Sequence, residues 1–129
     1  MRDARATLGV VFGTGIIREP LVSSLRMVNI HLGVSPYYRG SGTNFWAMYN
    51  GDFHLVGATI HYLDPGIDTG DIICHVTVEP ETRDTAHTLG NRVIQKAVGR
   101  VAEVVLALME REVPATPQWP EANAHVYRN

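Results

Sequence analysis

The first thirty or so residues alternate between short apolar runs and turn-forming sequences. Residues 6–12, ATLGVVF, are an apolar run that stops at the Gly-Thr-Gly of residues 13–15, as a buried strand does when it enters a turn. Residues 20–25, PLVSSL, place apolar side chains at helical spacing behind a proline, which a first helical turn tolerates. Residues 27–31, MVNIH, return to a strand-like pattern. The order strand, helix, strand predicts a β-α-β unit with parallel strands, and therefore an α/β fold.

The middle of the chain predicts a loop, a short helix and two more strands. Residues 32–42 contain three glycines, a proline and two tyrosines, a mixture that no regular element accommodates. Residues 43–50 fit a short helix. Residues 55–63 and 72–78 are rich in residues that favour strands. We expect these two strands to be joined by the aspartate-rich turn of residues 64–71.

The longest predicted element is a helix from residue 84 to about residue 111. Asp84 and Thr85 can cap its start, and apolar residues mark one of its faces. Gly90 and Gly99 lie inside it, and each costs about 1 kcal/mol relative to alanine. We expect both glycines to pack closely against a neighbouring element; the alternative is a helix that they merely weaken.

Composition narrows the class of protein. The chain has 129 residues, of which 45% are hydrophobic, enough for one core, so we expect a single domain over residues 1–129 with an irregular, proline-rich tail at 112–129. The net charge of -2 and the absence of a basic run disfavour nucleic acid and membrane partners and favour a small molecule. The lone Cys74 excludes an intramolecular disulfide, and no apolar run suits a signal peptide or membrane span. A cytoplasmic protein is the simplest prediction.

Four polar side chains near the predicted strand ends are candidates for chemistry: Asn29, His31, His61 and Asp68. Asn29 and His31 alternate along one strand, so their side chains point to the same side and can converge on one atom. Each of the four, taken alone, is explained by ordinary hydrogen bonding or turn chemistry. Together, an amide, an imidazole and a carboxylate can hold an oxyanion and move a proton while an amine attacks a formyl group.

Three other kinds of chemistry fit the residues less well. A metal site built from these histidines and the aspartate lacks the usual spacing of metal ligands. The Gly-Thr-Gly turn at residues 13–15 suggests a dinucleotide site, but Arg18 occupies the third glycine position, so a nicotinamide enzyme is the weaker alternative. Cys74 lies within a predicted strand and no serine lies in a G-x-S-x-G sequence, so nucleophilic catalysis is unsupported.

Two stretches, NIHLGVSPYYRG from Asn29 and GATIHYLDPGIDTGDII from Gly57, resemble the formyltransferase family that includes glycinamide ribonucleotide, methionyl-tRNA and amino-sugar formyltransferases. The resemblance covers roughly residues 8–108 and keeps Asn-x-His, Pro-x-x-Arg-Gly and His-x6-Asp-x-Gly in order and spacing. It implies a three-layer α/β fold with a mostly parallel sheet. It also implies metal-free transfer of a formyl group from 10-formyltetrahydrofolate to a primary amine of a sugar, a nucleotide-sugar or a related molecule.

The resemblance also implies roles for individual residues. Asn29 and His31 would stabilise the oxyanion, while Asp68 would keep His31 charged and help to take the proton lost by the amine. His61 and Gly70 would support the aspartate. Two further groups would flank the substrates: Gly13, Thr14, Gly15, Ile16, Ile17, Asp64 and Ile67 on the donor side, and Tyr37, Tyr38 and Arg39 on the acceptor side.

The chain departs from the family pattern in two places. It lacks the family's usual first three strands, so the fold is expected to be truncated in its amino-terminal half, and residues 32–36, LGVSP, replace a commoner loop sequence. A shortened sheet exposes an edge that soluble proteins pair or cover, which predicts a homodimer or larger assembly, or a fragment of a longer protein. The alternatives that stay open are a non-catalytic folate-binding or assembly module and hydrolysis of the donor.

Overall fold

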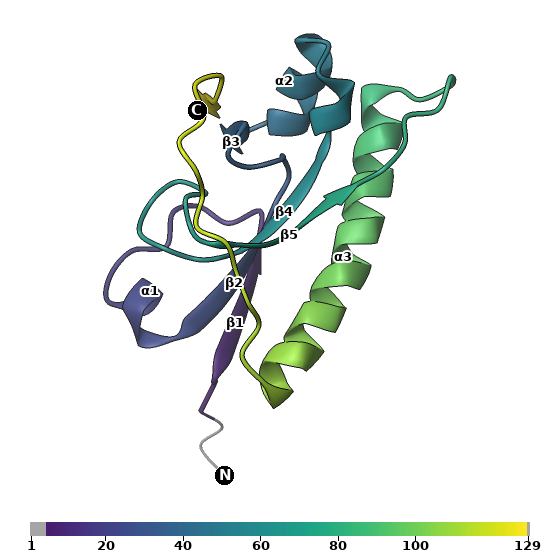
Figure 1. The fold of residues 1–129 in the computed structure, drawn as a ribbon. Coiled ribbons are helices and arrows are strands. Elements are labelled where there is room, and N and C mark those ends of the chain that lie inside the picture. Colours follow the sequence, from purple (N-terminus) through teal and green to yellow (C-terminus); the bar gives the residue numbers. More distant parts are fainter. Residues whose placement is uncertain (1–4, 129) are drawn as a thin grey trace.

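The computed structural model describes residues 5–128 (Figure 1). The predicted strands, the two short helices and the long helix are all found, with ends that differ by a few residues. The expectation that residues 32–42 hold no regular element is wrong, because a short strand lies within them and the tail pairs with it. The elements in chain order are β1 (Leu8–Phe12), α1 (Leu21–Ser24), β2 (Arg26–His31), β3 (Tyr38–Gly40), α2 (Thr43–Tyr49), the 3-10 turn η1 (Phe53–Leu55), β4 (Gly57–Tyr62), β5 (Ile72–Thr77), α3 (Ala86–Glu110) and β6 (His125–Tyr127).

The main sheet has the strand order β1-β2-β4-β5. β1 and β2 are parallel and joined through α1, as the predicted β-α-β unit requires. β4 is antiparallel to both β2 and β5, so the α/β class is confirmed but the sheet is mixed instead of mostly parallel. The connections explain this difference. Residues 63–71 are too few for a crossover, and residues 32–56 fold beyond the end of β2 and re-enter the sheet from that same end (Figure 1).

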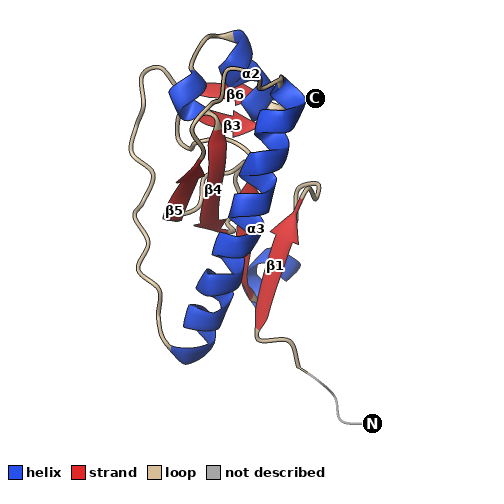
Figure 2. Cartoon of the chain, turned by 90° about the vertical axis from the view of Figure 1, so that its right-hand side faces the viewer, coloured by secondary structure: helices blue, strands red, loops and turns tan. Residues whose placement is uncertain are grey.

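The core lies between the sheet and α3, which runs across one face of it (Figure 2). Residues 57–61 of β4 are all buried, because β2 and β5 flank this strand and α3 covers it. Ile60 of β4 and Val93 of α3 are both fully buried. Burying a side chain of this size stabilises the fold by about 1.5–3 kcal/mol. This packing fixes β4, and with it His61, beside β2.

A capping box starts α3, as the sequence predicts for Thr85. Thr85 Oγ1 accepts the N–H of Thr88 at 3.1 Å, and Thr88 Oγ1 accepts the N–H of Thr85 at 2.8 Å. The close packing expected at Gly90 and Gly99 is wrong, because a Cβ at either position would meet no atom within 4 Å. Both glycines therefore only lower the helix propensity. Within residues 5–128, neither α3 nor another helix is long and apolar enough to cross a membrane.

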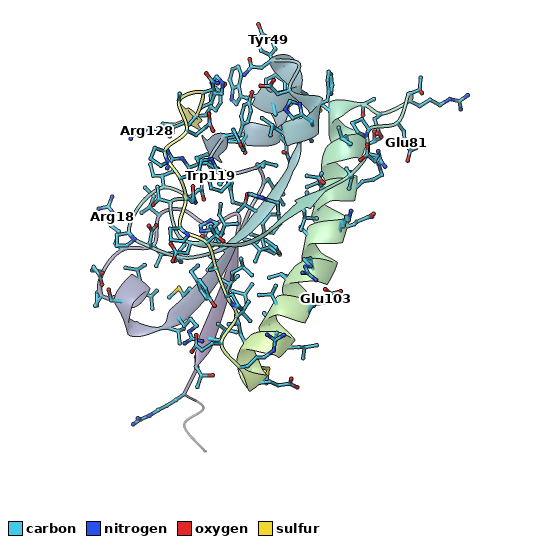
Figure 3. All side chains as sticks on the ribbon, viewed as in Figure 1. Arg18, Tyr49, Glu81, Glu103, Trp119 and Arg128 are labelled. Atoms are coloured by element: carbon cyan, nitrogen blue, oxygen red, sulfur yellow. The ribbon has the colours of Figure 1, made fainter. Side chains whose placement is uncertain are left out.

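The tail, predicted to be irregular over residues 112–129, makes ordered contacts. Thr116 forms an antiparallel bridge with Ile72 on β5, and β6 pairs in parallel with β3. Trp119, labelled in Figure 3, packs edge-on against Tyr37, with ring centroids 6.1 Å apart. The local sequence carries no clear strand pattern here. The tail is ordered because edge strands offer unpaired backbone groups to it.

β1 is an edge of the main sheet. Its Val10 and Phe12 side chains are 46% and 44% exposed, respectively. Exposed apolar edges are surfaces that soluble proteins normally pair or cover. The expected homodimer or larger assembly stays a prediction, which light scattering on the purified chain would measure.

Candidate active site

Two neighbouring strands and one connection bring the four candidate residues together. Asn29 and His31 lie on β2, and the sheet register places Asn29 directly opposite His61 on β4. Asp68 lies in the connection between β4 and β5, and its carboxylate contacts both strands. The site is thus assembled from residues far apart in the sequence, as the sequence reasoning expects, while the role of each residue stays a prediction.

The carboxylate of Asp68 is the centre of the cluster. Oδ1 accepts a hydrogen bond from Asn29 Nδ2 at 3.2 Å and lies 3.6 Å from His61 Nε2. Oδ2 lies 3.3 Å from His31 Nδ1 and accepts the N–H of Gly40 at 2.9 Å. Asn29 Nδ2 also lies 3.1 Å from His61 Nε2. Both imidazoles are buried, so water screens these interactions weakly.

The connection holds Asp68 in an unusual backbone conformation. Its φ is 51°, in the left-handed region that aspartate tolerates better than most residues. Such a conformation persists where surrounding contacts over-determine it. Hydrogen bonds within the connection are one such set of contacts. The Asp64 carboxylate accepts a hydrogen bond from the Thr69 hydroxyl at 2.8 Å and one from the N–H of Gly66 at 3.1 Å. Asp64 therefore shapes the turn that presents Asp68.

Two glycines let the backbone pass close to the histidines. A Cβ added at Gly33 would lie only 2.6 Å from His31 Nε2. One added at Gly70 would lie 1.7 Å from the carbonyl oxygen of Tyr62 and 3.2 Å from His61 Nδ1. A larger residue at either position must displace backbone or an imidazole. Gly70, which the resemblance expects to support the site, therefore lies at a position where a side chain would push against Tyr62 and His61.

Asp68 is ionised at neutral pH. Burial by itself would raise the pKa of this carboxyl, but the hydrogen bond with His61, attraction to His31 and the N–H of Gly40 outweigh it. The net pKa of Asp68 therefore lies below its usual value. The cluster holds a partly buried negative charge, which it can offer to a proton or to a cationic amine.

His31 is mainly neutral at pH 7 in the free chain. Burial lowers its pKa, and the charge of Asp68 and the carbonyl oxygen of Tyr38 oppose this only in part. The expectation that Asp68 keeps His31 charged is therefore wrong for this state. Nε2 lies 2.8 Å from the Tyr38 carbonyl oxygen and Nδ1 lies 3.3 Å from Asp68, so both ring nitrogens face acceptors. A neutral imidazole has one N–H for these two acceptors, so the ring has a place for one more proton.

A cavity of about 910 Å³ opens beside the cluster. Ile16 at its wall is 61% exposed, and a Cβ at Gly13 or Gly15 would meet no atom within 4 Å. This loop therefore presents apolar surface and open backbone to a ligand. Within residues 5–128 no group of His, Cys, Asp or Glu side chains is placed to hold a metal ion. The cavity is lined by Asn29, His31 and Asp68 and by all the expected donor-side residues, namely Gly13, Thr14, Gly15, Ile16, Ile17, Asp64 and Ile67.

Comparison with known protein families identifies the family of this chain. The model of a family described as formyl transferase matches residues 7–105, a span that includes the whole Asn29, His31, His61 and Asp68 cluster. The chain belongs to the formyl transferase family. The family expected from the two sequence stretches is thereby confirmed, over nearly the same residues.

Curated formyl transferases of two kinds are similar to the chain. GDP-perosamine N-formyltransferase of Brucella melitensis is 35% identical over 96 residues, which cover 74% of this chain and 36% of that protein. Methionyl-tRNA formyltransferase of Desulforamulus reducens is 33% identical over 91 residues, which cover 70% of this chain and 28% of that protein. The chain thus spans about a third of the length of these relatives.

A solved formyl transferase shares the fold. The formyltransferase PseJ from Anoxybacillus kamchatkensis, crystallised with UDP-4,6-dideoxy-4-formamido-L-AltNAc and tetrahydrofolate, has a TM-score of 0.79 and 26% sequence identity. The match covers 92% of this chain and 62% of that one. The arrangement of strands and helices described above is therefore that of a formyl transferase catalytic fold, over the part that the chain contains.

The expected acceptor-side residues of this formyl transferase chain do not line the cavity. Tyr38 is fully buried, and its hydroxyl donates to the Asp52 carboxylate at 2.6 Å. Tyr37, just before β3, and Arg39, on β3, flank it without reaching the cavity wall. Their role toward an acceptor stays a prediction. The segment that does reach the wall begins one residue later, at Gly40.

The end of the formyl transferase chain also reaches the cavity, which sequence reasoning missed. Tyr127 and Arg128 line its wall (Figure 3 labels Arg128). Tyr127 is held by Trp46 of α2, whose ring is stacked on it at a centroid distance of 4.8 Å. No local signal marks these residues as part of a site. They reach it because β6 pairs with β3, a contact that the sequence does not announce.

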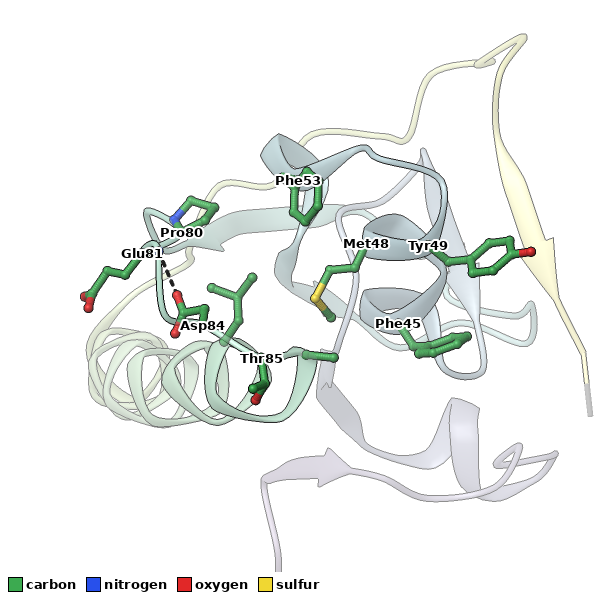
Figure 4. Close-up of a pocket in the computed structure, with 10 residues that line it drawn as sticks. Phe45, Met48, Tyr49, Phe53, Pro80, Glu81, Asp84 and Thr85 are labelled. Atoms are coloured by element: carbon green, nitrogen blue, oxygen red, sulfur yellow. Dashed lines mark hydrogen bonds between the residues drawn. The ribbon is translucent and has the colours of Figure 1, made fainter.

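A second cavity, of about 320 Å³, lies between α2 and the start of α3 (Figure 4). Aromatic residues such as Phe45 and Tyr49 form one side of it. The Asp84 carboxylate on the other side accepts the N–H of Glu81 at 2.8 Å, the dashed line in Figure 4, and so serves the start of α3. The polar groups here are engaged in capping and in ion pairs with Arg92, and we assign this cavity no chemistry.

Proposed function

We propose that this chain carries the reaction centre for transfer of a formyl group from 10-formyltetrahydrofolate to the primary amine of a sugar, a nucleotide-sugar or a related small molecule. One observation supports this above all others. The Asp68 carboxylate lies 3.2 Å from Asn29 Nδ2 and 3.3 Å from His31 Nδ1, at the wall of a cavity of about 910 Å³. Membership of the formyl transferase family supports the same chemistry.

Asn29 and His31 are the proposed stabilisers of negative charge. When an amine attacks a formyl carbon, charge develops on the formyl oxygen, and a preorganised donor there typically lowers the barrier by about 3 kcal/mol. In the free chain Asn29 Nδ2 faces Asp68 and His61. A bound formyl oxygen would take the place of one of these two acceptors. Because β2 fixes the Asn29 backbone, the donor needs only a side-chain adjustment.

Asp68 and His31 are the proposed carriers of the amine's proton. Asp68 is ionised, and His31 has one N–H between two acceptors. A proton released by the attacking nitrogen can therefore be held by this pair without leaving a buried charge unpaired. An imidazole that gains this proton places a positive charge beside the developing oxyanion. Charge stabilisation and proton transfer are thus coupled through the 3.3 Å contact.

The cavity fits the size and character of the proposed donor. 10-Formyltetrahydrofolate supplies an activated formyl group on a flat, partly apolar ring system. The exposed Ile16 and the open backbone around Gly13 and Gly15 offer an apolar wall with main-chain polar groups. The Asp64 and Ile67 turn lines the same cavity. Its volume lies in the range typical of small-molecule sites.

The net charge and two of the similar proteins support an amino sugar over a polyanion as the acceptor. The net charge is -2, and recognition of a nucleic acid backbone requires a concentration of Lys and Arg. One similar protein is named as a GDP-perosamine N-formyltransferase, and PseJ was crystallised with a formamido nucleotide-sugar. Both facts support a sugar amine for this chain.

The test is an assay of the purified chain with 10-formyltetrahydrofolate and a panel of amino sugars and nucleotide-sugar amines. Tetrahydrofolate release and the mass of the formamide product are the two readouts. Asp68→Asn is expected to lower turnover by about a thousandfold, because it removes the proposed proton acceptor while keeping the side chain's shape. The matched control is Asp71→Asn, an exposed aspartate at the end of the same connection. Turnover that Asp68→Asn leaves unchanged would overturn the assignment.

Two further measurements separate the other readings. Tetrahydrofolate release that does not depend on any amine would identify hydrolysis of the donor. Isothermal titration that shows binding of a stable donor analogue by a chain without turnover would identify a folate-binding module. Transfer requires both binding and an amine-dependent formamide product.

A further inference from the structure

Gln118, in the tail, donates two hydrogen bonds to the main chain of the connection that carries Asp68. Its Nε2 lies 2.7 Å from the main-chain carbonyl oxygen of Asp68 and 2.9 Å from that of Gly70. A carbonyl oxygen only accepts hydrogen bonds, so two of them require a donor with two hydrogens. An amide nitrogen is such a donor. Gln118 therefore satisfies both carbonyls at once, on either side of Thr69.

We propose that Gln118 is a positioning residue for Asp68. Gln118 holds the main chain of Asp68 so that the Asp68 carboxylate stays between Asn29 and His31. The inference rests on the proposed function, because it concerns the residue to which that function assigns the proton. The proposed role is to set geometry, and Gln118 touches no reacting atom in it.

Asp68 is held at both of its ends. Its carboxylate is fixed by Asn29 Nδ2 and by the N–H of Gly40. Its main chain is left-handed, with φ at 51°, and relaxation of this conformation would swing the carboxylate away from β2. Gln118 opposes that relaxation because it donates hydrogen bonds to the main-chain carbonyl oxygens of both Asp68 and Gly70.

The tail delivers Gln118 along a fixed path. Thr116 and Ile72 exchange two backbone hydrogen bonds, each of 2.8 Å, two residues before Gln118. Further back, the Tyr62 hydroxyl donates to the carbonyl oxygen of Val113 at 2.9 Å. Both anchors lie at the two ends of the β4–β5 connection. Gln118 is therefore placed relative to the strands that flank Asp68.

The same tail also contacts the segment around Gly40, whose N–H donates to the Asp68 carboxylate. The Tyr127 carbonyl oxygen accepts the N–H of Ser41 at 2.9 Å, and a Cβ at Gly40 would lie only 1.9 Å from that oxygen. Gly40 donates its own N–H to Asp68. One segment thus fixes the main chain of Asp68 directly and fixes a donor to its side chain through β3.

The experiment compares Gln118→Glu and Gln118→Met with Gln95→Met. Glu keeps the shape but sets a carboxylate against two carbonyl oxygens, and Met keeps the length but donates nothing. Gln95 is the chain's other glutamine and lies exposed on α3. The first readout is the titration of His31 by nitrogen-15 NMR, in which a His31→Gln variant assigns the resonances. Asp68, His61 and Arg39 are the charged or titratable groups that influence His31, so loss of Asp68 from its place is expected to move the titration midpoint to lower pH.

The second readout is steady-state turnover. A displacement of about 1 Å at a reacting group costs about a hundredfold in rate, so kcat is expected to fall ten- to a hundredfold in both Gln118 variants. KM for the donor is expected to change little, since Gln118 does not line the cavity. Gln95→Met is expected to match the wild-type chain in both readouts.

Two results would overturn the inference. One is an unchanged His31 midpoint and unchanged kcat in folded Gln118 variants. The other is loss of folding in both variants, which would make Gln118 a residue of stability alone. Failure of the proposed function is a separate result: if Asp68→Asn leaves turnover unchanged, or no amine is formylated, the His31 titration still decides whether Gln118 positions Asp68.

Discussion

Gly33→Ala is expected to displace His31 and to strain the backbone at residue 33, whose φ is 156°. The added Cβ would lie 2.6 Å from His31 Nε2 and 2.5 Å from Thr43 Oγ1. Thr43 yields poorly, because it is 1% exposed and its hydroxyl donates to the carbonyl of Leu32. Since ordinary contact begins at 3.4 Å, restoring it from 2.6 Å moves the imidazole by about 0.8 Å. A misplacement of about 1 Å costs about a hundredfold in rate, so kcat is expected to fall by roughly that factor.

The assay for Gly33→Ala joins turnover at saturating donor and amine with the nitrogen-15 resonances of His31. Gly90→Ala is the matched control, because its Cβ would meet no atom within 4 Å and it lies far along the chain in α3. Thermal unfolding followed by circular dichroism shows that both variants fold. A folded Gly33→Ala chain with wild-type turnover and unmoved His31 resonances would refute the reasoning from crowding.

Two further predictions concern stability. Gly90→Ala and Gly99→Ala are each expected to raise the free energy of unfolding by about 1 kcal/mol. The two effects are expected to add, because the sites are nine positions, or about 13.5 Å, apart along the helix. Urea unfolding measures this, and a loss of stability would contradict the open space found at both sites. His31 has a lowered pKa in the fold, so the unfolded chain binds its proton more readily and stability should fall as pH drops below about 6.5. Thermal unfolding of His31→Gln between about pH 6.5 and pH 5 should show a flatter dependence than the wild-type chain, whereas parallel curves would argue against a buried, neutral imidazole.

The sequence predicts most elements here because their signals are local. The apolar run at residues 6–12, the capping residues before α3 and the aspartate-rich turn at 64–71 each depend on neighbours within a few positions. The same holds for the spacing of Asn29 and His31, since alternation along a strand fixes that they share a side. The resemblance that these motifs carry is confirmed at the level of the family.

Local signals fail where distant segments decide. The antiparallel direction of β4 follows from where residues 32–56 re-enter the sheet, and nothing inside the strand's own sequence states it. Gly90 and Gly99 suggest close packing, but whether a neighbour exists beside a helix is a property of the assembled fold. The carboxylate partner of His31 by itself favours a charged imidazole, whereas burial, which depends on the whole fold, lowers the pKa of His31.

By itself the sequence therefore determines which chemical groups are available and on which local elements they stand: Asn29 and His31 on a strand, Asp68 in a turn. Only the tertiary structure decides their distances and charge states, and it alone brings Gln118 and Tyr127 from the tail to the site. The physical reason is that backbone preference and side-chain spacing act over a few residues. Strand pairing, desolvation and hydrogen bonds between segments depend on which surfaces meet when the whole chain packs.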